Sequence, residues 1–397
     1  MTKDRAIIYL AIAQTLVWAG LYYLFPALLV RWEQSFGWSK ADLTGAITLA
    51  IFVSAFVAPL AGRLIDSGKG ALMMAGSTFL GGICLVGLSF VTSQREFYLV
   101  WALIGVMMAG CLYEPCFALI THARGVKAKQ AIILVTLVAG FASTISFPAA
   151  HALSEAFDWN TAVQIFALVL IFIATPLMWL GAHRVERDGI MSHVSRQEEV
   201  THRHAFLVRP AFWLLALGFG LLALVHGVTI HHMFPILYDR GVSADVAVIA
   251  ASFIGPMQVA GRLAMMAAER HVSMKAITTS CFILVGIAIL LLFGSSSTPT
   301  LLVGFVILFG AAHGVVSIVR PVIAREILGG NNFGAKFGAM ALLYLVGSAS
   351  APFVGALIWG VGGYDLVLPL LIGLSLVGLC LYLAAHRFSS PSDVVKH

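Results

Sequence analysis

Charged residues are scarce in this 397-residue chain: Asp, Glu, Lys and Arg make up 11% of it, whereas 60% of the residues are apolar. A soluble domain carries about 25% charged residues, so a water-soluble globule of this size is excluded. Intrinsic disorder is excluded as well, because disordered chains are poor in apolar residues. The composition leaves a polytopic membrane protein in contact with the lipid bilayer.

Motifs for covalent or metal chemistry are also missing. The five cysteines lie in apolar stretches without a Cys-x-x-C pair, so neither a disulfide framework nor a zinc site is indicated. No phosphate-binding G-x-x-x-x-G-K motif occurs, which excludes ATP as the energy source. No metal-ligand cluster or nucleophile with its base lies in the apolar runs. We therefore expect no enzyme, no cofactor and no metal.

Long apolar runs are abundant. A spanning helix needs about 20 predominantly apolar residues, and twelve such runs occur. They predict an all-α membrane protein of twelve transmembrane helices in two six-helix, pseudo-symmetric bundles. The runs cover residues 6–30, 42–62, 70–92, 98–121, 130–153, 160–182, 209–235, 243–268, 274–293, 300–322, 337–360 and 365–386.

One long polar stretch, 183–208, separates the sixth run from the seventh. It divides the chain into an N-terminal six-helix bundle (1–182), a cytoplasmic linker (183–208) and a C-terminal six-helix bundle (209–397). Three motif pairs recur in the same order in both bundles, which indicates duplication, a common construction in transporters that hold substrate between repeats. The pairs are G-W-S-K-A-D (37–42) with G-V-S-A-D (241–245), A-P-L-A-G-R-L (58–64) with G-P-M-Q-V-A-G-R-L (255–263), and Y-E-P (113–115) with V-R-P (319–321).

The distribution of Lys and Arg predicts the orientation. With the N-terminus in the cytoplasm, 18 of the 24 basic residues fall in cytoplasmic segments, four fall outside and two lie within helices. Both termini are therefore expected in the cytoplasm, and the protein is expected in the plasma membrane (the inner membrane of a bacterium). This asymmetry accounts for the net charge of +6, so no nucleic-acid partner is expected.

The motif G-R-L-I-D (62–66) follows the second run. Together with two six-helix repeats and a cytoplasmic linker, it resembles the major facilitator superfamily over the whole chain. Two signatures of proton-driven drug exporters in that family are missing: Trp101 replaces their helix-four arginine, and residues 140–148 lack G-x-x-x-G-P. The resemblance implies a monomeric transporter and a gating role for three residues, Gly62, Arg63 and Asp66.

The segment I-G-P-M-Q-V-A-G-R-L (254–263) is similar to helix eight of monocarboxylate transporters and oxalate/formate exchangers, as is the F-P pair at 25–26 to helix one of the former. In those families an arginine at this place binds the substrate carboxylate, which implies that role for Arg262. Ala27 stands where the monocarboxylate group has a lysine, and Gln258 where it has an acid. The proton-coupling site of that group is therefore not carried over.

Ionisable side chains inside apolar runs cost about 2.5–3.5 kcal/mol on insertion scales and need a reason. Arg262 offers a planar fork for a carboxylate, with Gln258 one turn earlier as a neutral donor. The alternative is that Arg262 copies Arg63 as a latch residue. Arg320 and Glu114 occupy equivalent places in the two repeats, each before a proline.

We expect Arg320 to bind substrate and Glu114 to carry a proton, since an unpaired carboxyl in an apolar site gains proton affinity. The resemblance places helices four and ten at the central cavity, where the two opposed side chains would form an ion pair that breaks as the halves move. The alternative is neutralisation by neighbours such as Arg124 or Glu326. Histidine titrates near neutral pH, so His226 and His231 are further candidates for proton coupling, with His232 less favoured. His313 is assigned to packing.

Tyr22 and Tyr23 are candidate substrate contacts, with Gln14 two turns earlier. The sequence thus predicts a secondary active transporter that moves a small, monocarboxylate-like organic anion by alternating access, coupled to a proton. The alternative within transport is an efflux antiporter for a drug, a metabolite or a toxic oxyanion.

Overall fold

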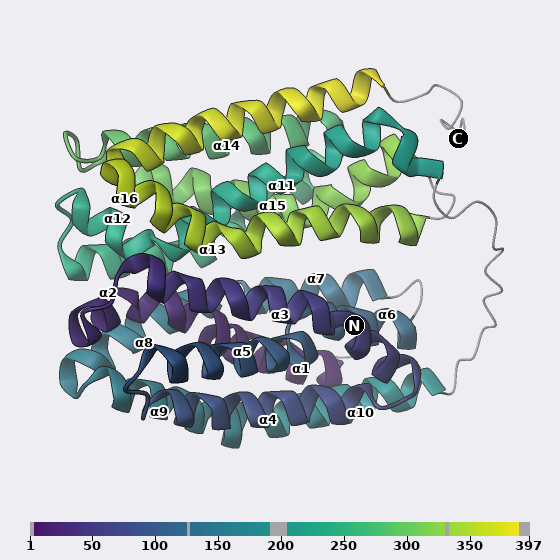
Figure 1. Ribbon diagram of the computed structural model, residues 1–397. Helices are drawn as coiled ribbons and strands as arrows, with labels where there is room; N and C mark the ends of the chain where they lie inside the picture. Colours follow the sequence, from purple (N-terminus) through teal and green to yellow (C-terminus); the bar gives the residue numbers. More distant parts are fainter. Residues whose placement is uncertain (1–3, 125–127, 191–204, 330–332, 389–397) are drawn as a thin grey trace. The chain divides into compact units, whose positions relative to one another are not determined.

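The computed structural model describes residues 4–124, 128–190, 205–329 and 333–388. All regular secondary structure within these ranges is helical (Figure 1). Eleven described helices are long and apolar enough to cross a membrane, and the last of them, Lys336–Arg387, contains a break at Gly362 and Gly363. With that helix counted as two segments, the twelve-helix prediction is confirmed for the described ranges.

The chain divides into two compact units, 1–196 and 197–397. In the first unit the π-helices η1 and η3 interrupt long helices, and α10 continues through residues 183–190 of the segment predicted as a linker. Residues 191–204 of that segment lie outside the described residues. The elements of the first unit are α1 (Arg5–Val17), η1 (Trp18–Tyr23), α2 (Leu24–Phe36), α3 (Lys40–Asp66), α4 (Gly70–Leu88), α5 (Gln94–Cys111), α6 (Tyr113–Arg124), α7 (Ala128–Ala139), α8 (Ala142–Ala156), α9 (Trp159–Val169), η3 (Leu170–Ala174) and α10 (Thr175–Ile190).

The second unit has fewer and longer elements. After the short 3₁₀ helix η4, each apolar run folds as one helix, and α12 forms a short extension of α11 beyond His232. The elements are η4 (Ala205–Val208), α11 (Pro210–His231), α12 (Met233–Asp239), α13 (Ala244–Ala268), α14 (Met274–Gly294), α15 (Leu301–Leu328) and α16 (Phe333–Arg387).

The repeated G-x-S motif ends one helix and starts the next. Gly37 has a φ of 66° after α2, and Gly241 has a φ of 75° after α12, a left-handed conformation that glycine adopts without strain. Ser39 then caps α3 in a reciprocal capping box with Asp42. Ser243 stands at the equivalent N-cap of α13, although its side chain makes no capping hydrogen bond. The duplicated sequence therefore produces the same turn in both units.

Small residues let equivalent helix pairs approach closely in the two units. A Cβ placed on Gly105 of α5 would lie 2.3 Å from the carbonyl oxygen of Ala50 on α3. In the second unit, a Cβ on Gly261 of α13 would lie 2.3 Å from the carbonyl oxygen of Ala311 on α15. Lipid tails are as apolar as the surfaces of the helices, so the hydrophobic effect does not drive helices together within the bilayer. Close packing of small residues is instead a main source of helix association there. These glycines therefore set the helix spacing that positions the polar side chains described below.

The fourth run is not one straight helix. α5 ends at Cys111, Leu112 has extended backbone angles, and α6 begins at Tyr113. Pro115 lacks the N–H that would bond to the carbonyl of Cys111 four residues earlier. The side chain of Gln14 replaces that donor: its Nε2 donates to the Cys111 oxygen at 2.8 Å and to the Leu112 oxygen at 3.3 Å. Gln14 is fully buried, so it stabilises the break from inside the unit.

We predict that Gln14→Leu, which keeps the side-chain volume, lowers the stability of the protein. The substitution leaves the buried Cys111 carbonyl without its donor, a change that costs about 1–3 kcal/mol. Thermal unfolding in detergent measures it as a lower melting temperature. Gln94→Ala, at an exposed position in the first turn of α5, is the control and should melt like the wild type. Equal melting temperatures for Gln14→Leu and the wild type would show that the break does not depend on Gln14.

Candidate functional site

Arg320 lies on α15 beside two aromatic rings of α16. Its guanidinium carbon is 3.9 Å from the centre of the Tyr344 ring and 5.5 Å from that of Phe337. Nε and Nη1 of Arg320 are buried and have no hydrogen-bond partner in the described part of the chain. The Tyr344 ring stabilises the positive charge through a cation–π contact but accepts no conventional hydrogen bond from these donors. Arg320 is therefore a partly desolvated cation with unused donors.

Arg262 and Gln258 lie one turn apart on α13, and both are 5% exposed. The Arg262 Nε donates to the carbonyl oxygen of Gly314 on α15 at 3.0 Å. Gly314 allows this contact because it lies directly against α13: a Cβ there would be 2.2 Å from the Gln258 carbonyl oxygen. One nitrogen of Arg262 thus joins α13 to α15.

Two histidines face each other beside these arginines. The rings of His226 on α11 and His313 on α15 stack with centroids 3.2 Å apart and planes inclined by 2°. Phe309, one turn before His313, stacks on His226 at 5.2 Å. The Nδ1 of His226 is buried and has no hydrogen-bond partner among the residues described. Two charged imidazoles at this separation would repel by about 5 kcal/mol at an effective dielectric constant of about 20, so the pair accommodates one positive charge at most.

We name His226, Arg262, His313 and Arg320 the cationic cluster. Its members come from α11, α13 and α15, and both arginines act electrostatically on the His313 ring. His313 and Arg320 share one face of α15 because they are seven residues, or two turns, apart. The cluster brings together three residues predicted from sequence (His226, Arg262 and Arg320) and adds His313. Chemically it can hold an anion and, on one imidazole, a proton.

The described part of the second unit contains five carboxylates. All five carboxylates in the described part of the second unit are exposed and lie at or near helix ends. In particular, no ion pair joins Arg320 to Glu326 there, so neutralisation by that neighbour, the alternative drawn from the sequence, is not observed. The five are Asp239, Asp245, Glu269, Glu326 and Asp365.

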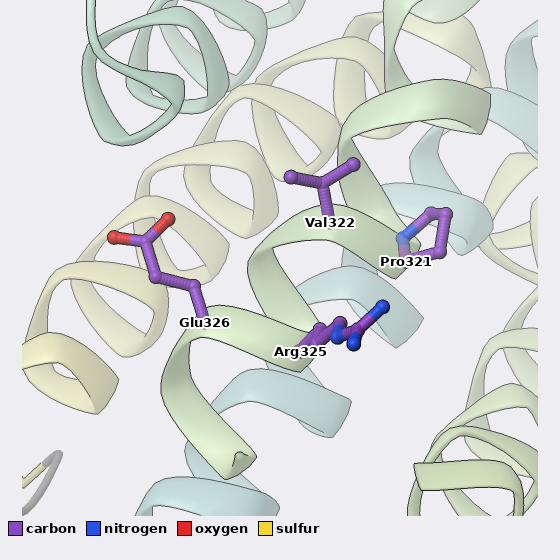
Figure 2. Close-up of a pocket in the computed structure, with 4 residues that line it drawn as sticks. All are labelled: Pro321, Val322, Arg325 and Glu326. Carbon is purple, nitrogen blue, oxygen red and sulfur yellow. The ribbon is translucent and has the colours of Figure 1, made fainter. Parts of the chain in front are cut away.

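A cavity of about 510 Å³ lies beside the last turns of α15 and is lined by Pro321, Val322, Arg325 and Glu326 (Figure 2). Figure 2 shows the side chains of Arg325 and Glu326 leaving α15 in different directions. Both are exposed. All four lining residues follow Arg320 on α15, and Arg320 itself is not among them.

In the first unit, Tyr22 and Tyr23 belong to an aromatic group around Trp18. The Trp18 ring lies 4.9 Å from Tyr22 and 4.6 Å from Tyr113, and Tyr23 lies 5.3 Å from Tyr22. Trp18, Tyr22 and Tyr23 all sit on the π-helix η1, a geometry frequent at functional sites. The Ser146 hydroxyl donates to the Ala19 carbonyl at 2.8 Å and braces this segment. Both tyrosines are half-buried.

Glu114 stands in the first turn of α6, directly after the break at Leu112, and its side chain is exposed. Within the described ranges it forms no hydrogen bond or ion pair. Arg124, the neighbour considered as its partner, instead pairs with Asp4. Partial burial works to raise the pKa of Asp4, but the hydrogen bond and the charge of Arg124 outweigh it and hold that pKa below its usual value. The role of Glu114 stays a prediction.

The gating motif lies at the end of α3, where Arg63 and Asp66 are exposed and Gly62 is half-buried. The His122 Nδ1 lies 4.0 Å from the Asp66 carboxylate.

The remaining candidate histidines are bound into the fold. His231 is fully buried, and its Nδ1 lies 2.9 Å from the carbonyl oxygen of Gly227 on its own helix. His232, also fully buried, bridges the Tyr364 hydroxyl at 2.9 Å and the Pro352 carbonyl oxygen at 2.8 Å. His231 is thus tied to its own helix, and His232 ties the end of α11 to α16.

Sequence reasoning missed His313 and Tyr344. The available signal for His313 was its spacing of two turns from Arg320, which places both on one face of a helix. Tyr344 gave no signal, because its contact with Arg320 depends on how α15 and α16 pack.

We predict that Gly314→Ala destabilises the second unit. The added Cβ meets backbone, not a mobile side chain, so α13 and α15 must separate, and such overpacking costs about 1–3 kcal/mol. The control is Gly304→Ala on the same helix, where the new Cβ meets only the end of the Leu291 side chain. Thermal unfolding in detergent should give a lower melting temperature for Gly314→Ala and an unchanged or higher one for Gly304→Ala. Equal values for the two variants would contradict the close packing of α13 on α15.

Comparison with known proteins places the chain in a family. The model of the Major Facilitator Superfamily matches residues 10–277. Among curated proteins, the MFS transporter asaE of Aspergillus flavus is 22% identical over 346 residues, which is 86% of this chain and 76% of that protein. Monocarboxylate transporter 12 of Xenopus laevis is 24% identical over 327 residues, covering 75% of this chain and 71% of that protein.

Solved structures show the same fold. The nucleoside transporter NupG superposes with a TM-score of 0.71 at 14% identity, covering 98% of this chain and all (100%) of that one. A bacterial homologue of the human lysosomal transporter Spinster, in an inward-facing and occupied conformation, gives a TM-score of 0.68 at 15% identity over 98% of both chains. With the family model matching more than half of its length, the chain is a multi-pass membrane transporter that belongs to the Major Facilitator Superfamily.

Proposed function

We propose that this transporter carries a small organic anion of the monocarboxylate type across the membrane by alternating access, together with a proton. The observation that carries the proposal is Arg320, whose Nε and Nη1 are buried without an acceptor in the described residues. An uncompensated cation in a membrane helix is costly and marks a substrate or ion site. An anionic substrate supplies the missing acceptor.

A carboxylate suits these donors better than other acceptors do. Hydrogen bonds between a guanidinium and a carboxylate are charge-assisted and about twice as strong as neutral ones. The carboxylates of the described second unit are exposed near helix ends, so none competes inside the bundle. Arg262 adds a second positive charge across the α13–α15 contact. Gln258, buried one turn away, is the proposed neutral donor.

The relatives support this substrate class. Monocarboxylate transporter 12 of Xenopus laevis is 24% identical to the chain. Arg262 lies in the segment 254–263, which resembles helix eight of the monocarboxylate transporters. In the first unit we propose Tyr22 and Tyr23 as substrate contacts and Glu114 as a proton carrier. In the second unit His226 is the proposed carrier, because His231 is held by its own helix.

The proposed topology has both termini in the cytoplasm, a linker around residues 183–208 and two six-helix bundles, 1–182 and 209–397, that rock against each other in one monomer. The asymmetry of Lys and Arg supports it. Gly62, Arg63 and Asp66 are the proposed latch, and the exposed side chains of Arg63 and Asp66 at the end of α3 are accessible to a moving partner segment.

The purified protein reconstituted in liposomes should take up [14C]lactate, [14C]pyruvate or [14C]benzoate when an inward proton gradient is imposed. Uptake should be saturable, and collapsing the gradient with a protonophore should abolish accumulation. Accumulation that ignores the proton gradient, or transport of none of the three acids, would contradict the proposal. Extrusion of a drug or metabolite in exchange for protons would then favour the efflux alternative.

Replacing Arg320 tests the site directly. We expect Arg320→Lys, which keeps the charge but loses the fork, to weaken apparent affinity roughly 10- to 100-fold, because a charge-assisted hydrogen bond contributes about 1.5–3 kcal/mol. Arg320→Gln should abolish uptake. Arg270→Gln, at an exposed position after α13, is the matched control and should transport like the wild type.

Melting temperatures of the same variants separate binding from a structural role. Because Arg320 is uncompensated without substrate, Arg320→Gln should melt at or above the wild-type temperature, as expected when a desolvated charge is removed. A large destabilisation of Arg320→Gln, or near-normal transport by Arg320→Lys, would remove Arg320 from the substrate site.

A further inference from the structure

His226 and His313 form a contact that the proposed function does not yet use as a unit. Their rings are parallel and 3.2 Å apart, and they join α11 to α15. Phe309, which belongs to α15, also stacks on the His226 ring. The His226 Nδ1 is buried and lacks a partner within the described ranges, so a nitrogen that can exchange a proton is present at the contact.

Building on the proposed function, we propose that His226 and His313 act as one proton-binding site, and that this site fills when an organic anion binds at Arg320. The pair, and not either histidine alone, would then carry the proton that accompanies each anion. The inference goes beyond the sequence analysis, which assigned His313 to packing.

The stacked geometry limits the pair to one proton. Two imidazolium rings in face-to-face contact repel, whereas one imidazolium above a neutral ring meets no such repulsion. The site therefore has two states, neutral and singly protonated. A proton enters from water on one side of the membrane, bonds to a ring nitrogen, and leaves to water on the other side. No covalent bond in the protein is made or broken.

The positive charges beside the pair link its protonation to anion binding. The positive charges of Arg262 and Arg320 both act on the His313 ring. Without substrate they therefore disfavour a third positive charge, that of a protonated histidine. A carboxylate bound at Arg320 cancels one of these charges and makes room for the proton. Linkage is reciprocal, so protonation of the pair strengthens anion binding in turn. Proton and anion therefore bind together, as symport requires.

The titratable groups on the helices packed against the histidine pair lie in other contacts or elsewhere on those helices. His231 acts on His226 from the same helix, but its Nδ1 faces the carbonyl of Gly227. The Tyr344 ring on α16 lies against the Arg320 guanidinium. The remaining titratable residues of the neighbouring described helices are Tyr238 and Asp239 on α12, Asp245 on α13, Lys275 and Cys281 on α14, Arg325 and Glu326 on α15, and Lys336, Tyr364, Asp365, Cys380, Tyr382, His386 and Arg387 on α16.

The test is a count of protons taken up per acid bound. Purified protein in weakly buffered detergent solution at about pH 7 receives saturating [14C]benzoate or [14C]lactate; equilibrium dialysis gives the acid bound, and a pH-indicator dye gives the protons taken up. At this pH the free acids are ionised, so a proton taken up on binding comes from the solution and not from the acid. The wild type should take up about one proton per acid bound.

In His226→Gln and His313→Gln the ratio should fall to near zero, each variant alone being sufficient because the pair acts as one site. His271→Gln, an exposed histidine after α13 in the same unit, is the matched control and should keep the wild-type ratio. A ratio near one in either pair variant would overturn the inference, as would a wild type that binds acid without taking up a proton.

Failure of the proposed function gives a different result. If the wild type binds none of the acids, the proposed anion site is absent. If the variants bind acid with an unchanged proton ratio, the anion site stands and only the role of the histidine pair is wrong. A measurement on the wild type alone covers the case of a variant that does not fold. Infrared difference spectra of protein with ring-labelled histidine should show neutral imidazole converting to imidazolium when benzoate binds. No change in the histidine bands upon binding would also overturn the inference.

Discussion

The uncompensated guanidinium of Arg320 is the constraint on which the proposed mechanism depends. Moving an ion from water into an apolar bundle costs several kcal/mol even after relaxation, and the protein offsets only part of this with the rings of Tyr344 and Phe337. Two buried nitrogens remain without acceptors in the described chain. Such a residue favours binding of an anion, because the anion would offset the desolvation free energy of the guanidinium.

The two arginines of the cluster share the work unequally. Arg262 uses its Nε to join α13 to the Gly314 carbonyl, so it provides charge from a fixed position. Arg320, held mainly by cation–π contacts, keeps donors for a ligand. This division depends on glycine, since the missing side chains of Gly314 and Gly261 let α13 and α15 lie backbone to backbone. Helix packing by small residues therefore positions an arginine of the proposed anion site.

The sequence predicted the fold because the signals for it are local. Apolar run lengths follow from bilayer thickness, and the G-x-S turns follow from the left-handed φ of Gly37 and Gly241. The break in the fourth run was not predicted, although Pro115 was visible, because its stability depends on Gln14 from another helix. The polarity of Gln14 groups it with Tyr22 and Tyr23 as a cavity-lining side chain, whereas the structure shows it buried against backbone carbonyls.

The candidate site was predictable only in part, for the same reason. A charged residue in an apolar run is rare and is recognised from the sequence alone, so Arg262, Arg320 and Glu114 could be chosen as candidates without a structure. The partner of each charge is fixed by helix packing, so His313 and Tyr344 emerged from the structure. His231 and His226 looked alike in sequence, yet one ring faces its own helix and the other stacks on α15.

The central claim is that a carboxylate substrate bonds to Arg320. Solid-state NMR of the protein in lipid, with a ¹³C-carboxylate label on benzoate and ¹⁵N-guanidinium arginine, measures the distance between the two groups. The account predicts a bound carboxylate carbon within about 4 Å of a guanidinium nitrogen, with the signal lost in Arg320→Lys. Benzoate that binds with no arginine nitrogen near its carboxylate would contradict the account.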